Sequence, residues 1–162
     1  MKRIKTGLGF DVHEFDINRK LILGGIEIPF DKGLLGHSDA DALLHAICDA
    51  ILGALALGDI GKHFPNNDEK YKNIDSKILL HNVNELIKTH GYEIGNIDAM
   101  LLLEKPKISP FIEAMRESID SLIKIGIENI SIKATTTETL GFVGREEGIA
   151  AMASVLLYPT EE

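Results

Sequence analysis

The order of strand-like and helix-like segments along the chain is the feature that most constrains its fold. Alternating or continuous apolar residues predict strands, whereas apolar residues three or four positions apart predict helices. From the N-terminus, these patterns give two strand regions, two helices, a strand, a helix and two final strands. This order predicts an α+β fold, in which a mixed sheet of four or five strands carries its helices on one face.

The boundaries of these segments follow from turn and cap residues. Strands are predicted at residues 4–12, in two short pieces within 21–29, and at 97–103, 130–134 and 149–158. Helices are predicted from Ser38 to about Leu57, from a cap at Asp75 to His90, and from Ser109 to before Gly126. Ser38, with Asp41 three residues later, resembles a capping box, and Ser109 before Pro110 forms a cap and first-turn pair. Residues 31–36, 58–71 and 135–148 are predicted to be loops.

Length and charge limit what kind of protein this is. The 162 residues favour one globular domain over 1–162. A formal net charge of −8 argues against nucleic acid and anionic membranes as partners, since both require clusters of Lys and Arg. One cysteine excludes an intramolecular disulfide, and the N-terminus has no apolar signal-peptide stretch. We therefore expect a cytoplasmic protein.

The last predicted strand suggests self-association. Residues 150–157 are apolar almost throughout, with few charges to protect them. If helices cover only one face of the sheet, the other face needs a cover of its own. We expect this run to mediate sheet-to-sheet contact in a homo-oligomer.

Three side chains could form a metal site. Asp11 and His13 lie two apart in a predicted strand, so both project from the same face, and His45 lies in a predicted helix. Two histidines and one carboxylate suit zinc or a similar ion with one coordination position left open for substrate. The alternative is that these are ordinary polar residues at a strand end and on a helix surface.

Two further polar segments also have two interpretations each. His37 and Ser38 could contact an anion near a helix N-terminus, although helix capping explains much of the polarity between His37 and Asp41. The segment from Thr135 to Glu138 could cradle phosphate oxygens, with Glu138 binding a hard ion such as Mg²⁺, or it could be a threonine-rich turn. The glycines after it do not have the spacing of a Walker or dinucleotide-binding loop.

Taken together, these segments resemble the 2-C-methyl-D-erythritol 2,4-cyclodiphosphate synthase family. The likeness covers nearly the whole chain in the family's order. The matching stretches are residues 9–13, 32–39, 41–45, 56–61, 64–65, 106–107, 133–138 and 141–145.

The resemblance implies an α+β homotrimer with sheets packed around a threefold axis and active sites between adjacent subunits. The substrate would be 4-diphosphocytidyl-2-C-methyl-D-erythritol 2-phosphate. Its 2-phosphate would attack the β-phosphate, closing a cyclic diphosphate and releasing CMP. The chain would then be a phosphorus–oxygen lyase of the non-mevalonate isoprenoid pathway, in its monofunctional form.

The resemblance also assigns roles to individual residues. It implies zinc at Asp11, His13 and His45, and Mg²⁺ or Mn²⁺ near Glu138. His37 and Thr136 would support the charged transition state, with Ser38 and Thr135 beside them.

Substrate contacts are implied for four regions. Residues 59–61 would contact sugar hydroxyls, 64–68 the methylerythritol, and 103–109 the cytosine, while Phe142 and Arg145 would lie near the 2-phosphate and the central cavity of the trimer. The full set of implied contacts is Asp11, Val12, His13, His37, Ser38, Asp59, Ile60, Gly61, Phe64, Pro65, Asn66, Asn67, Asp68, Leu103, Glu104, Lys105, Pro106, Lys107, Ile108, Ser109, Thr135, Thr136, Thr137, Glu138, Phe142 and Arg145.

The chain departs from the family pattern at Asn66, Leu103 and Ser109, which affects fine contacts and not the expected reaction.

Two other functions are compatible with the same residues. One is a metal-dependent phosphodiesterase that uses water, and the other is a non-catalytic trimer that binds isoprenoid phosphates. An intact set of metal ligands argues against the second, because a pure binder needs no open metal position.

Overall fold

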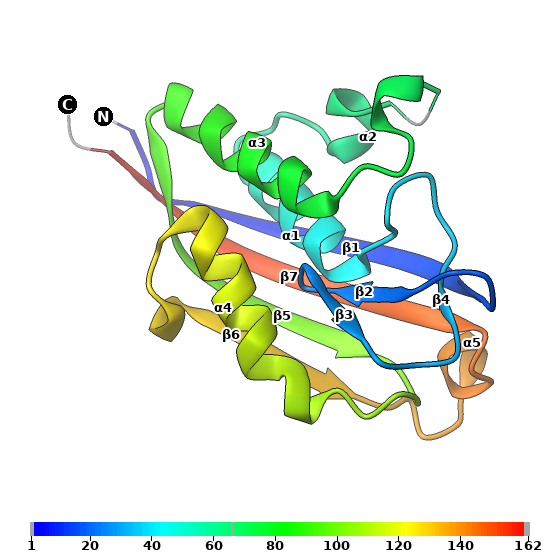
Figure 1. The fold of residues 1–162 in the computed structure, drawn as a ribbon. Helices are drawn as coiled ribbons and strands as arrows, with labels where there is room; N and C mark the ends of the chain where they lie inside the picture. The colour runs from blue at the N-terminus through cyan, green and yellow to red at the C-terminus, as the bar shows by residue number, and fades with distance from the viewer. Residues whose placement is uncertain (1, 66, 161–162) are drawn as a thin grey trace.

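A five-stranded mixed sheet forms one layer of the molecule, and helices cover one of its faces (Figure 1). The computed structural model describes residues 2–65 and 67–160. The strands of the sheet lie in the order β4-β1-β7-β5-β6, and β2 and β3 form a separate hairpin. Only β5 and β6 run parallel, whereas the other neighbours are antiparallel. The predicted α+β fold, strand number and helix placement are therefore confirmed.

The elements have the following bounds. The strands are β1 (Lys5–Asp16), β2 (Leu21–Leu23), β3 (Ile26–Ile28), β4 (Gly33–Leu34), β5 (Tyr92–Leu102), β6 (Ile130–Thr135) and β7 (Gly148–Pro159). The helices are α1 (Ala42–Ala54), α2 (Ile60–His63), α3 (Ser76–Thr89), α4 (Ile112–Ile123) and α5 (Gly141–Gly144). Three short 3₁₀ turns are η1 (Glu69–Tyr71), η2 (Ser109–Phe111) and η3 (Ile127–Asn129). The short elements β4, α2, η1 and α5 lie in segments that were predicted to be loops.

Two predicted helix starts are wrong. Ser38 does not begin α1, because Ala40 has φ +59 and the chain turns there before the helix begins. The cap is Asp41, whose side chain accepts from the backbone N–H of Leu44. Ser109 does not cap α4 either, since it lies inside the 3₁₀ turn η2 and the helix begins at Ile112. The cap predicted at Asp75 is confirmed.

Helix α1 is the centre of the core. It packs against β1 and β7 on one side and against α3 on the other. Eleven of its thirteen residues are buried, so it is apolar on nearly every side. A polar side chain on one of its buried sides therefore needs a hydrogen-bond partner.

Two glycines bring β1 and α1 into direct backbone contact. A Cβ atom at Gly7 would lie 1.8 Å from the carbonyl oxygen of Ala50, and one at Gly9 would lie 1.9 Å from that of Ala46. No other residue fits at these positions without moving the helix. This contact sets the distance between His45 on α1 and the side chains that follow Gly9 on β1.

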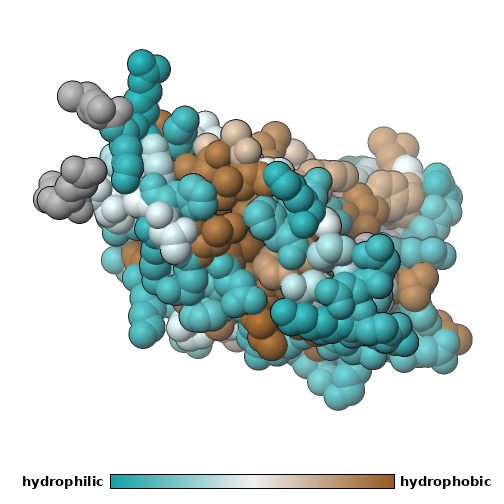
Figure 2. Space-filling view, turned by 90° about the horizontal axis from the view of Figure 1, so that it is seen from above, coloured by the Kyte–Doolittle hydropathy of each residue, from teal (hydrophilic) through white to brown (hydrophobic). Residues whose placement is uncertain are grey.

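The opposite face of the sheet exposes apolar side chains. Leu8, Phe10 and Val12 alternate along β1 with the inward residues, and they are 68%, 55% and 41% exposed. Met152 lies opposite Phe10 on the neighbouring strand β7 and is also exposed. Apolar side chains reach the surface in the view from above as well, where a brown area lies between teal polar side chains (Figure 2). None of the described helices is both long and apolar enough to cross a membrane.

Candidate metal centre and active site

Asp11, His13 and His45 converge on one point. Alternation along β1 turns Asp11 and His13 toward the helix layer, and α1 presents His45 from above the strand. Asp11 Oδ2 lies 2.9 Å from His13 Nε2 and 3.0 Å from His45 Nδ1, and the two nitrogens are 3.2 Å apart. Ligands about 2.0–2.2 Å from a tetrahedral zinc lie roughly 3.3–3.6 Å from each other, so three atoms this close can share one ion. The three side chains can therefore hold a divalent metal.

Both histidines are oriented through their second ring nitrogen. His13 Nδ1 donates to the backbone oxygen of Leu35 at 2.7 Å, which leaves Nε2 free to face Asp11. His45 Nε2 lies 3.1 Å from Ser38 Oγ and 3.0 Å from Ser76 Oγ, so its Nδ1 faces the cluster. Hydrogen bonds of this kind typically hold metal-binding histidines in place.

The charges of the cluster favour an anionic carboxylate. Burial alone would raise the pKa of Asp11, but the adjoining imidazoles of His13 and His45 outweigh it and lower the pKa to about 2. Burial likewise disfavours the charged form of His13, but the hydrogen bond to the Asp11 carboxylate raises the pKa of His13 above its usual 6.5. The Asp11 carboxylate therefore stabilises positive charge next to it.

The cap residue Asp41 and Asp49 on α1 hold neighbouring segments. Asp41 is fully buried and accepts from the backbone N–H groups of Gly24 at 3.0 Å and Gly25 at 2.7 Å, which fixes the β2-β3 turn. Burial raises the pKa of Asp41 to about 6. Asp49 accepts from the backbone N–H of Ile60 at 2.8 Å, which fixes the start of α2, and burial raises its pKa too. Asp41, His45 and Asp49 follow one another at intervals of four residues, but each makes a different contact. Asp41 binds the β2-β3 turn, His45 belongs to the metal trio, and Asp49 binds the start of α2.

A cleft of about 360 Å³ opens over the metal trio. Eight predicted site residues line it together, namely Asp11, His13, His37, Ser38, His45, Asp59, Ile60 and Gly61. Gly36 and Asp49 complete the lining and were not predicted. A ligand in this cleft would therefore lie next to the metal trio.

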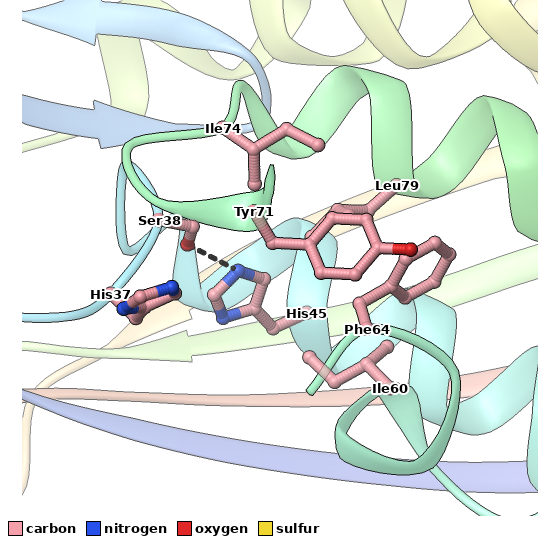
Figure 3. Close-up of a pocket in the computed structure, with 8 residues that line it drawn as sticks. All are labelled: His37, Ser38, His45, Ile60, Phe64, Tyr71, Ile74 and Leu79. Atoms are coloured by element: carbon pink, nitrogen blue, oxygen red, sulfur yellow. Dashed lines mark hydrogen bonds between the residues drawn. The ribbon is translucent and has the colours of Figure 1, made fainter. Parts of the chain in front are cut away.

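A small apolar hollow of about 40 Å³ adjoins His45 (Figure 3). Phe64 and Tyr71 pack edge to face, with ring centroids 5.5 Å apart, and form one of its walls. The remaining lining residues are His37, Ser38, Ile60, Ile74 and Leu79. Phe64, predicted to contact substrate, therefore lies beside the metal cleft.

A second cleft of about 360 Å³ lies at the carboxyl ends of β5 and β6. It is lined by Leu103, Glu104, Pro106, Lys107, Ile108, Ser109, Ala134, Thr135 and Thr136. Glu104 joins its two sides, because its carboxylate accepts from the backbone N–H of Thr137 at 3.0 Å. Ligands of sheets with parallel strands typically bind at this end of the strands.

The second cleft is separate from the metal trio. Val12 pairs with Ala150, Ala150 with Leu102, and Leu102 with Thr135, so both clefts lie at the same end of the sheet. Three strand spacings of about 4.8 Å separate β1 from β6, which amounts to roughly 14 Å. The two clefts share no lining residue. Thr136 and Glu138 bond to each other at 2.9 Å, and Glu138 is not part of the metal trio.

The other predicted contacts are scattered. The Val12 side chain lies on the outer face of the sheet, Lys105 pairs with Glu146 at 2.9 Å, and Arg145 pairs with Glu147 at 2.8 Å. Pro65 is partly buried, Asn67 and Asp68 are exposed before η1, and Phe142 is exposed on α5. Asn66 lies outside the described residues.

Residues that support the metal trio were missed from the sequence. Asp39 and Ser76 bond to each other and lie behind His45, and Arg19 donates to the backbone oxygens of Gly36 and Ser38. These contacts join segments 17 to 37 residues apart. No local spacing signals them.

Comparison with known proteins gives one consistent result. The chain matches the YgbB family over residues 4–158. The 2-C-methyl-D-erythritol 2,4-cyclodiphosphate synthase of Bacillus cytotoxicus is 60% identical over 153 residues, which are 94% of this chain and 97% of that protein.

Solved structures agree with this match. The Plasmodium falciparum protein IspF, solved as a CDP complex, has a TM-score of 0.87 and 35% identity, and the match covers 99% of each chain. The bifunctional IspDF of Campylobacter jejuni has a TM-score of 0.94 and 45% identity over 98% of this chain. This chain spans 43% of the Campylobacter protein.

Proposed function

The chain belongs to the YgbB family, and from this premise we propose that it catalyses the cyclisation of 4-diphosphocytidyl-2-C-methyl-D-erythritol 2-phosphate. An oxygen of the 2-phosphate bonds to the β-phosphorus, the bond from that phosphorus to the oxygen of the α-phosphate breaks, and CMP leaves. The product is 2-C-methyl-D-erythritol 2,4-cyclodiphosphate, and no water is consumed. The chain is thus a phosphorus–oxygen lyase of the non-mevalonate isoprenoid pathway.

The observation that carries this proposal is the intact trio of Asp11, His13 and His45 in a chain 60% identical to a named synthase. Two imidazole nitrogens and one carboxylate oxygen are the ligand set that zinc accepts in open catalytic sites. We therefore propose zinc as the ion of the trio. When bound, it would act as a Lewis acid on the phosphate under attack.

The residues around the trio position the reacting groups. The Ser38 hydroxyl and the His37 ring line the cleft and can donate to phosphate oxygens. Asp59 at the rim can accept from sugar hydroxyls, and the apolar hollow beside Phe64 suits the carbon skeleton of the methylerythritol. Since the attack is intramolecular, holding the substrate folded supplies much of the rate enhancement.

The second cleft supplies the other half of the site. We assign the cytosine to the residues from Leu103 to Ser109, and the diphosphate to Thr135, Thr136 and Glu138. Glu138 would bind Mg²⁺ or Mn²⁺ on the α- and β-phosphates, since carboxylate and phosphate oxygens suit these ions. Thr136, with His37 from the first cleft, would stabilise the charge of the transition state.

The separation of the two clefts supports a homotrimer. Two metals that act on one phosphate group typically lie about 3.5–4 Å apart, far less than the roughly 14 Å between β1 and β6. This separation favours a site that is completed by two adjacent copies over a site within one chain. The exposed apolar face formed by Leu8, Phe10, Val12 and Met152 offers the surface for such packing.

Partners and location follow from composition. The net charge of −8 supports a small-molecule substrate rather than nucleic acid or an anionic membrane surface. Cys48 is the single cysteine of the sequence, so no intramolecular disulfide can form, which supports a reducing, cytoplasmic location.

Phosphorus NMR tests the reaction directly. The purified protein is incubated with the substrate, Zn²⁺ and Mg²⁺, and cyclic diphosphate signals are expected to grow together with CMP. Metal-dependent release of linear phosphates would instead make the protein a phosphodiesterase. Bound zinc with no turnover would make it a binding protein.

A further inference from the structure

We propose that Ser76 and Asp39 are positioning residues, which hold His45 in the one tautomer that can bind the metal. The proposal rests on the metal centre of the proposed function. It concerns Nε2 of His45, the ring nitrogen that does not face Asp11. Neither residue belongs to the metal trio.

The contacts form a chain from a carboxylate to the metal site. Ser76 is the first residue of α3 and is fully buried. Its hydroxyl bonds to Asp39 Oδ1 and lies 3.0 Å from His45 Nε2. Nδ1 of the same ring lies 3.0 Å from Asp11 Oδ2, so the chain runs straight into the trio.

Asp39 is itself held firmly. Its Oδ2 accepts from the backbone N–H of Ser76 at 3.0 Å, and its Oδ1 accepts from that of Asp41 at 3.2 Å. Its own N–H donates to the backbone oxygen of Ile74 at 3.1 Å. The carboxylate therefore has a fixed place between the start of α1 and the start of α3.

The direction of donation along this chain follows from the chemistry of its groups. An ionised carboxylate only accepts, so the Ser76 hydroxyl must donate its proton to Asp39. The Ser76 oxygen then has only lone pairs left for His45, so Nε2 must carry the ring proton. A neutral imidazole has one N–H, which leaves a lone pair on Nδ1 where the metal would bind.

Ser38 cannot set the tautomer in the same way. Its oxygen lies 3.1 Å from His45 Nε2, and it accepts from the backbone N–H of Ala40 at 3.1 Å. Within residues 2–65 and 67–160, no carboxylate bonds to the Ser38 hydroxyl. Its proton can therefore rotate toward the ring or toward the cleft, and it enforces neither tautomer.

Measurements of zinc affinity distinguish the role of Ser76 from that of Ser38. Metal-free wild-type protein, Ser76→Ala and Ser38→Ala are titrated with zinc in competition with a chromophoric chelator. We expect Ser76→Ala to weaken zinc binding by about 10–100-fold, as is usual when an outer partner of a metal ligand is lost. Ser38→Ala is expected to lose less than about 3-fold. Unchanged affinity in Ser76→Ala, or equal losses in both variants, would overturn the proposal.

Two further measurements separate positioning from a general loss of structure. Ser76→Ala keeps the backbone N–H that donates to Asp39, so the melting temperature of the metal-free form is expected to stay within a few degrees of wild type. If it falls further, Ser76→Thr, which keeps the hydroxyl, must restore zinc affinity, or the proposal fails. Nitrogen-15 NMR of metal-free protein should show the His45 proton on Nε2 in wild type and a mixture of tautomers in Ser76→Ala. A wild-type protein that binds no zinc would refute the metal centre itself, and with it this proposal.

Discussion

At the scale of single residues, His45 has the least freedom to be replaced. It is 6% exposed on a buried helix, and both ring nitrogens have partners, Asp11 on one side and the serine hydroxyls on the other. No other described side chain offers a third donor atom to Asp11 and His13. Loss of its ring would leave the proposed zinc with two protein ligands.

We therefore expect His45→Ala to lose bound zinc and to lower turnover by at least about 10³-fold, the equivalent of several kcal/mol of Lewis-acid stabilisation. Zinc content by elemental analysis and CMP release by chromatography would measure this. His81→Ala, which alters an exposed histidine on α3, serves as the control and should behave as wild type. Full zinc content in His45→Ala would remove His45 from the site.

Zinc affinity should depend on pH through His13. Zinc needs a neutral imidazole, and because the pKa of His13 is raised above 6.5, protons compete with zinc even above that pH. Asp11, with a pKa of about 2, stays ionised over this range and adds nothing to the pH dependence of zinc affinity. Affinity should fall about tenfold per pH unit below the folded pKa of His13 and level off above it. An affinity that stays constant from mildly acid to mildly alkaline pH would contradict this.

The raised pKa of His13 also makes the stability of the metal-free protein depend on pH. The folded pKa of His13 is above its unfolded value, so the added stability is full below pH 6.5 and is lost as the pH rises through the folded pKa. Denaturant unfolding of metal-free protein at several pH values would detect this loss.

A substitution at Glu138 tests whether this residue binds the second metal ion. Glu138 is exposed, has φ +52 and accepts a hydrogen bond from the Thr136 hydroxyl, so Glu138→Gln should leave the fold intact. Removing the charge should raise the Mg²⁺ concentration for half-maximal activity by about tenfold, the effect of one lost charge contact of roughly 1.4 kcal/mol. The readout is CMP release across a magnesium titration. An unchanged titration curve would assign that ion elsewhere.

Single site residues could be predicted where their residue type and their spacing along the chain both indicate a metal ligand. Asp11 and His13 are two apart on a strand, which places both on one face, and His45 was found by its helical context. Asp39 and Ser76 could not be predicted, because their link spans 37 residues and depends on how α3 packs against α1. Leu103 and Ser109 do line the second cleft, although the sequence alone left their contacts open.

At the scale of elements, the contact of β1 with α1 depends on glycine. Gly9→Ala would place a methyl group 1.9 Å from the Ala46 oxygen, so the helix would have to shift and carry His45 with it. We expect a loss of about 1–3 kcal/mol or more in the free energy of unfolding, and weaker zinc binding. Urea unfolding and zinc titration would measure both.

The control for this substitution is Gly53→Ala on the exposed side of the same helix. The nearest atom to its new Cβ would be 3.9 Å away, so no clash arises. Alanine in a helix interior should add about 0.5–1 kcal/mol of stability. Equal effects of the two substitutions would argue against the close approach.

Long elements were predictable and short ones were not. The helical periodicity of α3 and the apolar run of β7 are strong sequence signals, because many residues in each element fit the same pattern. Helix α1 was found, but its start was misplaced, because the turn at Ala40 arises from packing and not from its residue type. The four-residue helices α2 and α5 are too short for a period to appear.

At the scale of the whole molecule, the bare sheet face should govern assembly. Phe10→Asp places a charge at the centre of this face, on a side chain that is 55% exposed in the single chain. It should leave the chain folded but lower its mass in solution from that of a trimer to that of a monomer. Ile78→Asp, on the helix layer, is the control. Analytical ultracentrifugation gives the masses, and a monomeric wild type would refute the trimer.

The separation of the two clefts, which lie on strands β1 and β6 roughly 14 Å apart, has a genetic consequence. If each active site takes its metal trio from one chain and its threonine loop from the next, a chain that is defective in one half still carries the other. In a random equal mixture of two such defective chains, about one site in four would join two intact halves. Two null alleles that disable different halves would then complement each other within one cell.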